Sequence, residues 1–285
     1  ARVELHHRSK SVCRRGLDNL VIRLGVIGLN EGNGHPFSFS AIVNGYSDEG
    51  FARSGWPVIH EYLKRRTPDE IGLPDVHVTH AWTQDPEMTR RLCAASLIEH
   101  ATDNRDDMIG KVDGVLLARH DHESHLEMAM PFLEAGMWVL VDKPLSLDTS
   151  DLRAFLPYLV AGKLMSCSAL RYAPELDGIR SNMSGFGPLK LIQATVCLDW
   201  TKYGIHMIDA ILSLGSPAPV EIEPLRGDHE SFQLTLADNT PVRIDALGHT
   251  QVTFQLDIFG ELNKVSVGLY DNFPSFKRCL EAFVS

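Results

Sequence analysis

Apolar runs of strand length alternate with helical patterns along the first half of the chain. Strands are predicted at residues 21–29, 76–82, 112–118 and 137–142, and helices at residues 36–46, 58–66, 87–101 and 123–135. A crossover helix between two such strands places them parallel in one sheet. The alternation therefore predicts βαβ units in a doubly wound α/β domain over residues 20–147.

The pattern changes in the second half, where short strands follow one another with few helices between them. Helices are predicted at residues 149–160, 175–183, 203–214 and 273–284, and strands at 164–170, 190–198, 220–224, 231–236, 242–246, 251–258 and 264–269. Turn residues such as Asp238 and Asn239 separate the last strands, which indicates hairpins. Residues 148–285 are therefore predicted to form a second α/β domain with an open, largely antiparallel sheet.

Composition excludes several classes of protein. A net charge of −10 on 285 residues argues against general nucleic-acid binding, which needs a basic surface. No apolar stretch approaches the roughly 20 residues that span a bilayer. The five cysteines are scattered and form no C-x-x-C pair, which favours reduced thiols, a cytoplasmic location and no metal site. Residues 1–19, rich in Arg, Lys and His, are expected to form an irregular arm outside the fold.

A glycine-rich turn follows the first predicted strand. Glycines let the backbone approach a pyrophosphate, whose charge a helix N-terminus stabilises. In G-x-G-x-x-G terms the turn is one or two residues too long, and Asn30 replaces the second glycine; Asn tolerates the left-handed conformation. The residues predicted to bind a dinucleotide here are Gly28, Asn30, Gly32, Asn33, Gly34 and His35. A tight strand-to-helix corner without a ligand is the alternative.

The end of the second strand is where an acidic residue would bind the ribose of a dinucleotide. That position carries Thr83, with Asp85 two residues later. Thr83 leaves room for a 2′-phosphate, whereas Asp85 would repel one, so the pair slightly favours NAD(H) over NADP(H). The alternative is that Asp85 caps the following helix.

Two cationic or basic side chains have the chemistry that an alcohol oxidation needs. Lys143 follows an apolar strand directly and precedes Pro144, so it lies at the sheet edge where ligands bind. If a helix begins at Lys202, then Lys202, His206 and Asp209 lie on one face of it. A neutral His206 can accept the hydroxyl proton, and Lys143 can stabilise the alkoxide charge. A packed histidine and a surface lysine are the alternatives.

Several motifs, in order along the chain, resemble the Gfo/Idh/MocA family of NAD(P)-dependent oxidoreductases. They are the strand with its glycine-rich turn, Val112-Asp-Gly-Val-Leu-Leu-Ala118, His125, Ala135-Gly136, Val139-Leu-Val-Asp-Lys-Pro144, Arg171-Tyr-Ala-Pro174, and Gly204-Ile-His206 with Asp209. The resemblance covers roughly residues 21–269. It implies an N-terminal Rossmann domain and a C-terminal domain whose sheet forms a homodimer or homotetramer.

The resemblance also implies activity and site residues. It points to hydride exchange at a secondary alcohol or ketone of a polar ring, such as a sugar, amino sugar, sugar nucleotide or cyclitol. Lys143 and His206 match the catalytic residues, Arg119, His120 and His125 are expected near the cofactor, and Arg171, Tyr172, Asp199, Lys202, Tyr203 and Asp209 are expected to bind substrate. Many members carry Asp where this chain has Lys202. That departure keeps open a catalytically silent nucleotide-binding sensor, and a reductase of imines or amino acids is a third possibility.

Overall fold

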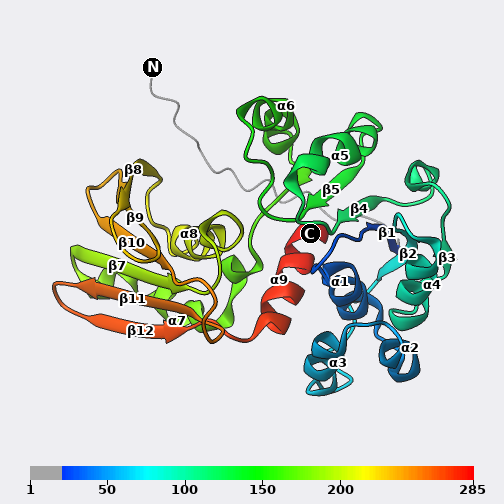
Figure 1. Cartoon of the computed structure of the whole chain (residues 1–285), viewed down its shortest axis with the longest axis horizontal. Coiled ribbons are helices and arrows are strands. Elements are labelled where there is room, and N and C mark those ends of the chain that lie inside the picture. The colour runs from blue at the N-terminus through cyan, green and yellow to red at the C-terminus, as the bar shows by residue number, and fades with distance from the viewer. Residues whose placement is uncertain (1–20) are drawn as a thin grey trace, which may run out of the picture.

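The computed structural model describes residues 21–285, so the predicted arm at residues 1–19 lies outside the described residues. The described chain forms two six-stranded sheets, each with its own helices and core (Figure 1). The predicted two-domain α/β architecture is confirmed.

The first sheet is entirely parallel and has the strand order β3-β2-β1-β4-β5-β6. Its strands are β1 (Ile22–Ile27), β2 (Val76–Trp82), β3 (His100–Ala101), β4 (Gly114–Leu117), β5 (Trp138–Val141) and β6 (Leu164–Met165). The central strands are buried on both faces, as the near-continuous apolar run of β4 requires. The strand order reverses between β1 and β4, which is where ligands bind in sheets of this kind.

Helices cover both faces of this sheet (Figure 1). On one side lie α1 (His35–Asn44), α2 (Asp48–Ala52), α3 (Pro57–Lys64) and α4 (Pro86–Ala95), and on the other lie α5 (His125–Glu134) and α6 (Thr149–Val160). Separate apolar cores lie on the two faces, one containing Phe37 and Leu92, the other Phe132 and Phe155. Short 3-10 turns at Arg105–Met108 and His122–Ser124 complete the domain.

The second sheet has the order β12-β11-β7-β10-β9-β8. Its strands are β7 (Leu189–Val196), β8 (Pro219–Leu225), β9 (Glu230–Leu236), β10 (Pro241–Ala246), β11 (Phe254–Gly260) and β12 (Lys264–Gly268). All its pairs are antiparallel except β7 with β10. α7 (Asp177–Ser181) and α8 (Ile205–Leu212) belong to this domain, as do 3-10 turns at Ala169–Tyr172, Pro174–Leu176 and Met183–Phe186.

Two segments of the second half of the sequence pack on the first domain. Strand β6 pairs with β5, and α9 (Asn272–Val284) packs against α1 and places Phe273 and Leu280 in the first core. In Figure 1 the red helix α9 accordingly stands between the two sheets. The predicted domain boundary at residue 147 therefore places β6 and α9 in the second domain, although both pack on the first.

Some predicted elements differ in the structure. The strand predicted at 164–170 is only β6 followed by a 3-10 turn, and the helix predicted at 87–101 ends at Ala95, two residues before Leu97 takes a positive φ of 54°. The helix predicted from residue 203 starts instead as a π-helical turn, Trp200–Gly204, before α8. Helix α2 was not predicted; it is only five residues long, too short to show helical periodicity.

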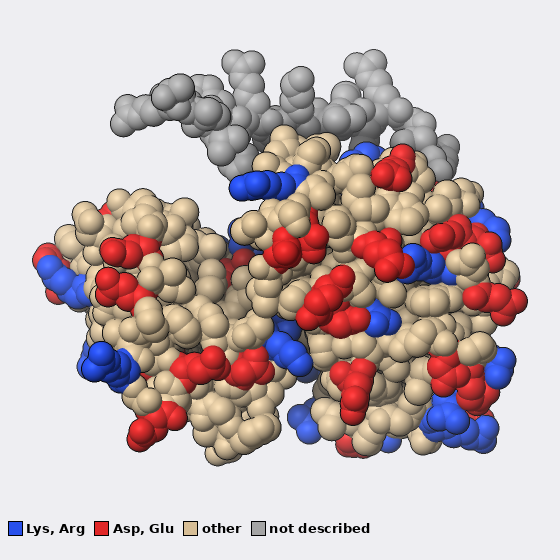
Figure 2. Space-filling model, turned by 45° about the horizontal axis from the view of Figure 1, so that its top comes forward, with Lys and Arg blue, Asp and Glu red and all other residues tan. Residues whose placement is uncertain are grey.

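Surface charge is mixed on the face shown in Figure 2, where acidic and basic side chains intermingle without a continuous basic patch. Among residues 21–285, no helix is both long and apolar enough to cross a membrane. The same view shows a hollow between the two domains.

Candidate active site

A cavity of about 540 Å³ lies between the carboxyl edge of the first sheet and the second domain. Residues 31–35 of the glycine-rich turn, Lys143 after β5 and His206 on α8 all line it. The lysine and the histidine are 63 positions apart in the chain, yet they face one space beside the point where the strand order reverses. This juxtaposition is the one that the sequence predicted.

Lys143 is held by burial rather than by an ion pair. Its side chain is only 7% exposed, and its Nζ donates to the carbonyl oxygen of Lys202 at 3.3 Å and lies 5.4 Å from the centre of the Tyr203 ring. Burial lowers the pKa of Lys143, although Asp142 and Asp199 act in the opposite direction. A lysine in this state is a stronger proton donor than a solvated one.

His206 is partly buried, and contacts hold its ring on two sides. Its Nδ1 lies 2.6 Å from the hydroxyl of Ser168, and its ring meets Phe254 edge-on at 5.7 Å. Burial, and secondarily the charge of Lys143, holds the pKa of His206 well below its ordinary value. The imidazole is therefore neutral at physiological pH and can accept a proton or a hydrogen bond.

Asp142 lies at the centre of a hydrogen-bond cluster beneath the cavity. Its Oδ2 accepts from the side-chain amide of Asn33 at 3.0 Å and lies 2.6 Å from Nδ1 of His35, and its Oδ1 accepts from the Lys143 N–H at 2.8 Å. Burial opposes ionisation, but the hydrogen bonds from His35 and Asn33 and the charge of Lys143 hold the pKa of Asp142 well below its ordinary range. The carboxylate thus ties the glycine-rich turn to the end of β5.

The glycine-rich turn leaves a row of backbone donors free. Within the described residues, the N–H groups of Asn30, Glu31, Gly32 and Gly34 have no acceptor, and the turn leads into the N-terminus of the ten-residue helix α1. Gly28 permits this course because a Cβ there would lie 2.3 Å from Pro36. Only Gly32 in the turn has a positive φ, 76°, so the predicted left-handed role of Asn30 and Asn33 is wrong; their side chains bind His120 and Asp142 instead.

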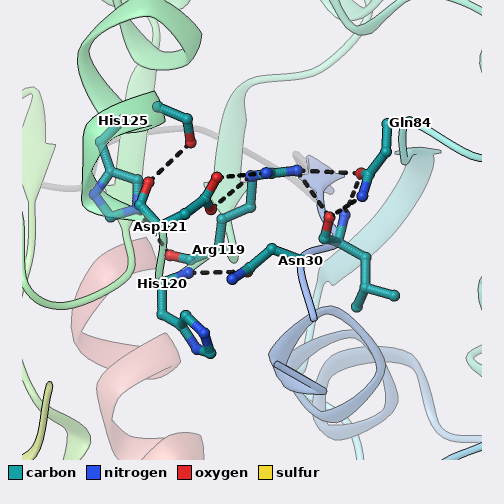
Figure 3. Close-up of polar contacts among 8 residues, drawn as sticks. Asn30, Gln84, Arg119, His120, Asp121 and His125 are labelled. Atoms are coloured by element: carbon teal, nitrogen blue, oxygen red, sulfur yellow. Dashed lines mark hydrogen bonds and ion pairs between the residues drawn. The ribbon is translucent and has the colours of Figure 1, made fainter. Parts of the chain in front are cut away.

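The buried side chain of Arg119 connects the segments that follow β1, β2 and β4 (Figure 3). The guanidinium of Arg119 forms a two-contact ion pair with Asp121 and donates to the Leu29 carbonyl at 2.8 Å and to Gln84 at 3.1 Å. Gln84 in turn binds both the N–H and the carbonyl of Leu29. Arg119 is therefore paired within the protein and holds the turn to the end of β2.

Three of the residues predicted to contact the cofactor are engaged elsewhere. His125 is fully buried, with Nε2 on the Arg119 carbonyl and Nδ1 on the Leu145 carbonyl, so it positions the loop after β4. Thr83 is 3% exposed and its hydroxyl binds Thr89, while Asp85 accepts the N–H of Glu87 as the cap of α4. The predicted contact of these three side chains with a cofactor stays a prediction; the capping alternative for Asp85 is confirmed.

These observations bear on whether a nicotinamide dinucleotide fits. The free N–H groups of the turn suit a diphosphate, and the cavity with Lys143 and His206 suits the nicotinamide end. At the other end, the buried Thr83 hydroxyl is paired within the protein, whereas the exposed Asp85 uses only Oδ1 as the cap of α4. The residues of the site therefore suit the diphosphate and the nicotinamide of the cofactor.

The predicted substrate residues divide into two groups. Lys202, Tyr203 and Asp199 line the cavity, although the Asp199 carboxylate also accepts the Lys202 N–H at 2.8 Å. Asp209 accepts the Ser168 N–H and pairs with Arg171, and neither of these two charged residues nor Tyr172 lines the cavity, so their contact with substrate stays a prediction. Lys202 lies in the π-helical turn, and Asp209 lies in α8.

The cavity also contains residues that the sequence did not single out. Ser168, His249, Phe254, Asn272 and Phe276 line it, the last two from α9. No motif marks them, and α9 reaches the cavity only because it packs back on α1. Only the fold brings these residues to the site.

The depressed pKa of His206 predicts a pH-dependent stability. Below about pH 6.5 the unfolded chain protonates this histidine and the folded protein does not, so stability falls as pH decreases. Between neutral pH and pH 5.5 this protonation should lower the free energy of unfolding by about 1.4 kcal/mol, and His206→Gln should not show that loss. Urea unfolding at the two pH values measures it. The exposed His77→Gln variant is the control, and equal slopes for both variants would contradict the expectation.

A sequence profile for the Gfo/Idh/MocA group, described as "Oxidoreductase family, NAD-binding Rossmann fold", matches residues 50–163, a segment that includes Lys143. This segment of the chain is therefore similar to the NAD-binding Rossmann domain of that family. This confirms the resemblance inferred from the motifs. No curated protein matched the sequence.

Solved structures show the same fold over nearly the whole chain. Apo scyllo-inositol dehydrogenase from Lactobacillus casei has a TM-score of 0.72 at 14% identity, over 94% of this chain and 88% of that one. Myo-inositol 2-dehydrogenase from Lactobacillus plantarum gives 0.71 at 16%, over 92% and 88%. The Lactobacillus casei enzyme with bound NAD(H) and scyllo-inositol gives 0.70 at 15%, over 93% and 88%. At these identities the likeness shows the fold.

Proposed function

We propose that this chain is an NAD(P)-dependent oxidoreductase of the Gfo/Idh/MocA family that exchanges hydride with a secondary alcohol or ketone of a polar ring. The observation that carries the proposal is the shared cavity of Lys143, His206 and the glycine-rich turn. The family's description as NAD-binding supports the cofactor class. Structural neighbours named as inositol dehydrogenases support a cyclitol or sugar as substrate.

The two side chains divide the chemistry at the reacting carbon. The nicotinamide supplies the hydride acceptor or donor when bound. Lys143 donates a hydrogen bond to the reacting oxygen, which stabilises alkoxide charge in a site with little water. Neutral His206 accepts a hydrogen bond from the hydroxyl, and Ser168 fixes its ring. Tyr203 and Lys202 bind the ring of the substrate, and Lys202 favours one that carries an anionic group.

The cofactor preference is a prediction of its own. NADH should bind more tightly than NADPH, since Arg119, the cation that hydrogen bonds to Gln84 at the end of β2, is already neutralised by Asp121. Nicotinamide fluorescence titrated separately with NADH and NADPH measures both dissociation constants. Equal affinities would contradict the preference, and no binding of either would contradict the cofactor class.

Turnover is tested with a panel of cyclitols, sugars, amino sugars and sugar nucleotides, followed by absorbance of the reduced nicotinamide. A sensor that binds nucleotide without catalysis would show binding and no turnover with any of them. The presence of both Lys143 and His206 in one cavity argues for the enzyme. Assembly into a homodimer or homotetramer through the second sheet remains part of the proposal.

A further inference from the structure

A histidine that lines the cavity beside Lys143 and His206 pairs with an aspartate beneath it, and this pair has had no role so far in the chemistry. His35, the first residue of α1, has its Nδ1 2.6 Å from Oδ2 of Asp142. The backbone N–H of His35 also donates to Asn33, whose amide donates to the same aspartate oxygen. His35 is therefore fixed by two contacts to one buried cluster, and its ring lines the cavity.

The pairing determines which nitrogen of His35 is available. An ionised Asp142 only accepts hydrogen bonds, so Nδ1 of His35 carries the proton and Nε2 has the free lone pair. Within residues 21–285, Nε2 has no hydrogen-bond partner. The ring stacks on Phe39 at 5.0 Å and 17°, and Phe276 meets its edge at 5.3 Å. A preset tautomer in a fixed ring is the arrangement that a general base requires.

His206 lacks this support. Its Nδ1 contacts the neutral hydroxyl of Ser168, and no carboxylate contacts its ring. Burial and the charge of Lys143 both oppose a proton on His206. Of the two histidines, only His35 contacts a carboxylate.

We propose that His35, oriented by Asp142, is the acid–base residue of this site. The inference rests on the proposed oxidoreductase function. In the oxidation direction the substrate O–H bond breaks and its proton forms an N–H bond at Nε2 of His35. The carbon–oxygen double bond forms as hydride leaves the same carbon for the nicotinamide. Lys143 donates a hydrogen bond from Nζ to the oxygen throughout the step.

Other charged and titratable groups line the same cavity as the His35 ring. They are Glu31 from the glycine-rich turn, His120 from the loop after β4, Lys143 from the end of β5, and Asp199, Lys202 and His206 from the second domain. α9 contributes Phe276 and Asn272, which carry no charge. Asp142 is the carboxylate that contacts the His35 ring directly.

The test compares His35→Gln, Asp142→Asn and His206→Gln with a matched control. The control is His60→Gln, because His60 also contacts an aspartate, Asp48 at 2.7 Å, and stacks on a phenylalanine, yet lines no part of this cavity. The readouts are NADH affinity by fluorescence, imidazole ¹⁵N spectra, thermal unfolding, and the pH profile of kcat/KM on the best substrate of the panel.

We expect His35→Gln to lower kcat/KM by about 10²-fold and to abolish the acidic limb of the profile, with NADH affinity within about threefold of the unchanged protein. His206→Gln should retain that limb. The ¹⁵N spectrum should show His35 as the Nδ1–H tautomer and should lose this preference in Asp142→Asn. His60→Gln should behave as the parent protein.

Three results would overturn the inference. One is a loss of NADH affinity in His35→Gln with an unchanged pH limb, which would make His35 a cofactor contact only. Another is loss of the limb in His206→Gln alone. The third is an Nε2–H tautomer for His35 in the parent protein. In all three the parent protein still turns over, so the proposed function survives; a parent that binds NADH and turns over nothing overturns both.

Discussion

Lys143→Ala is expected to lower kcat/KM by about 10²- to 10³-fold, because the variant removes the cation that stabilises the developing alkoxide. The effect is large because the ammonium group acts in a buried site, where Lys143 is only 7% exposed. Most of the loss should appear in kcat, since alkoxide charge develops in the transition state and not in the bound alcohol. Steady-state kinetics on the best substrate measure it.

The matched control is Lys163→Ala. Lys163 packs on an aromatic ring, with Nζ 3.6 Å from the centre of the Trp138 ring, but it lies at the opposite end of β5 from the cavity. Its loss should leave kcat/KM unchanged. NADH affinity of Lys143→Ala, measured by fluorescence, should change by less than about tenfold. Equal kinetics for the two variants would rule out a catalytic Lys143.

The second large effect is on stability. Asp142→Ala is expected to lower the free energy of unfolding by about 3 kcal/mol, because it leaves buried donors without an acceptor. These are the amide of Asn33, the N–H of Lys143 and Nδ1 of His35. The carboxylate is 6% exposed, so water cannot replace it fully. Urea unfolding at neutral pH measures the loss.

An exposed carboxylate provides the comparison. Asp113 also pairs with a cation and a backbone N–H, those of Arg23, but its side chain is 40% exposed. Asp113→Ala should therefore cost no more than about 1 kcal/mol. The difference between the two variants should persist at mildly acidic pH, because the low pKa of Asp142 keeps it ionised there. A smaller loss for Asp142→Ala than for Asp113→Ala would contradict the role of Asp142 as the link between the turn and β5.

Local patterns in the sequence determined the elements and one half of the site. The strand and helix periods predicted β2 at residues 76–82 and α6 at 149–160 with the bounds that the structure shows. The apolar run before Lys143 placed that lysine at the carboxyl edge of a parallel sheet, and the glycine-rich turn after β1 placed free N–H groups at the same edge. These features depend on neighbours in sequence, so they are readable from it.

Only the tertiary structure decided which polar groups pair across the cavity. His35 and Asp142 are 107 positions apart, and Arg119 reaches Leu29 over 90. No local pattern indicated that Arg119 and His125 would form internal hydrogen bonds, or that α9 would bring Phe276 to the site. Periodicity reports which face of an element is buried. It does not report which buried group faces which, because that depends on how the two sheets and the last helix pack together.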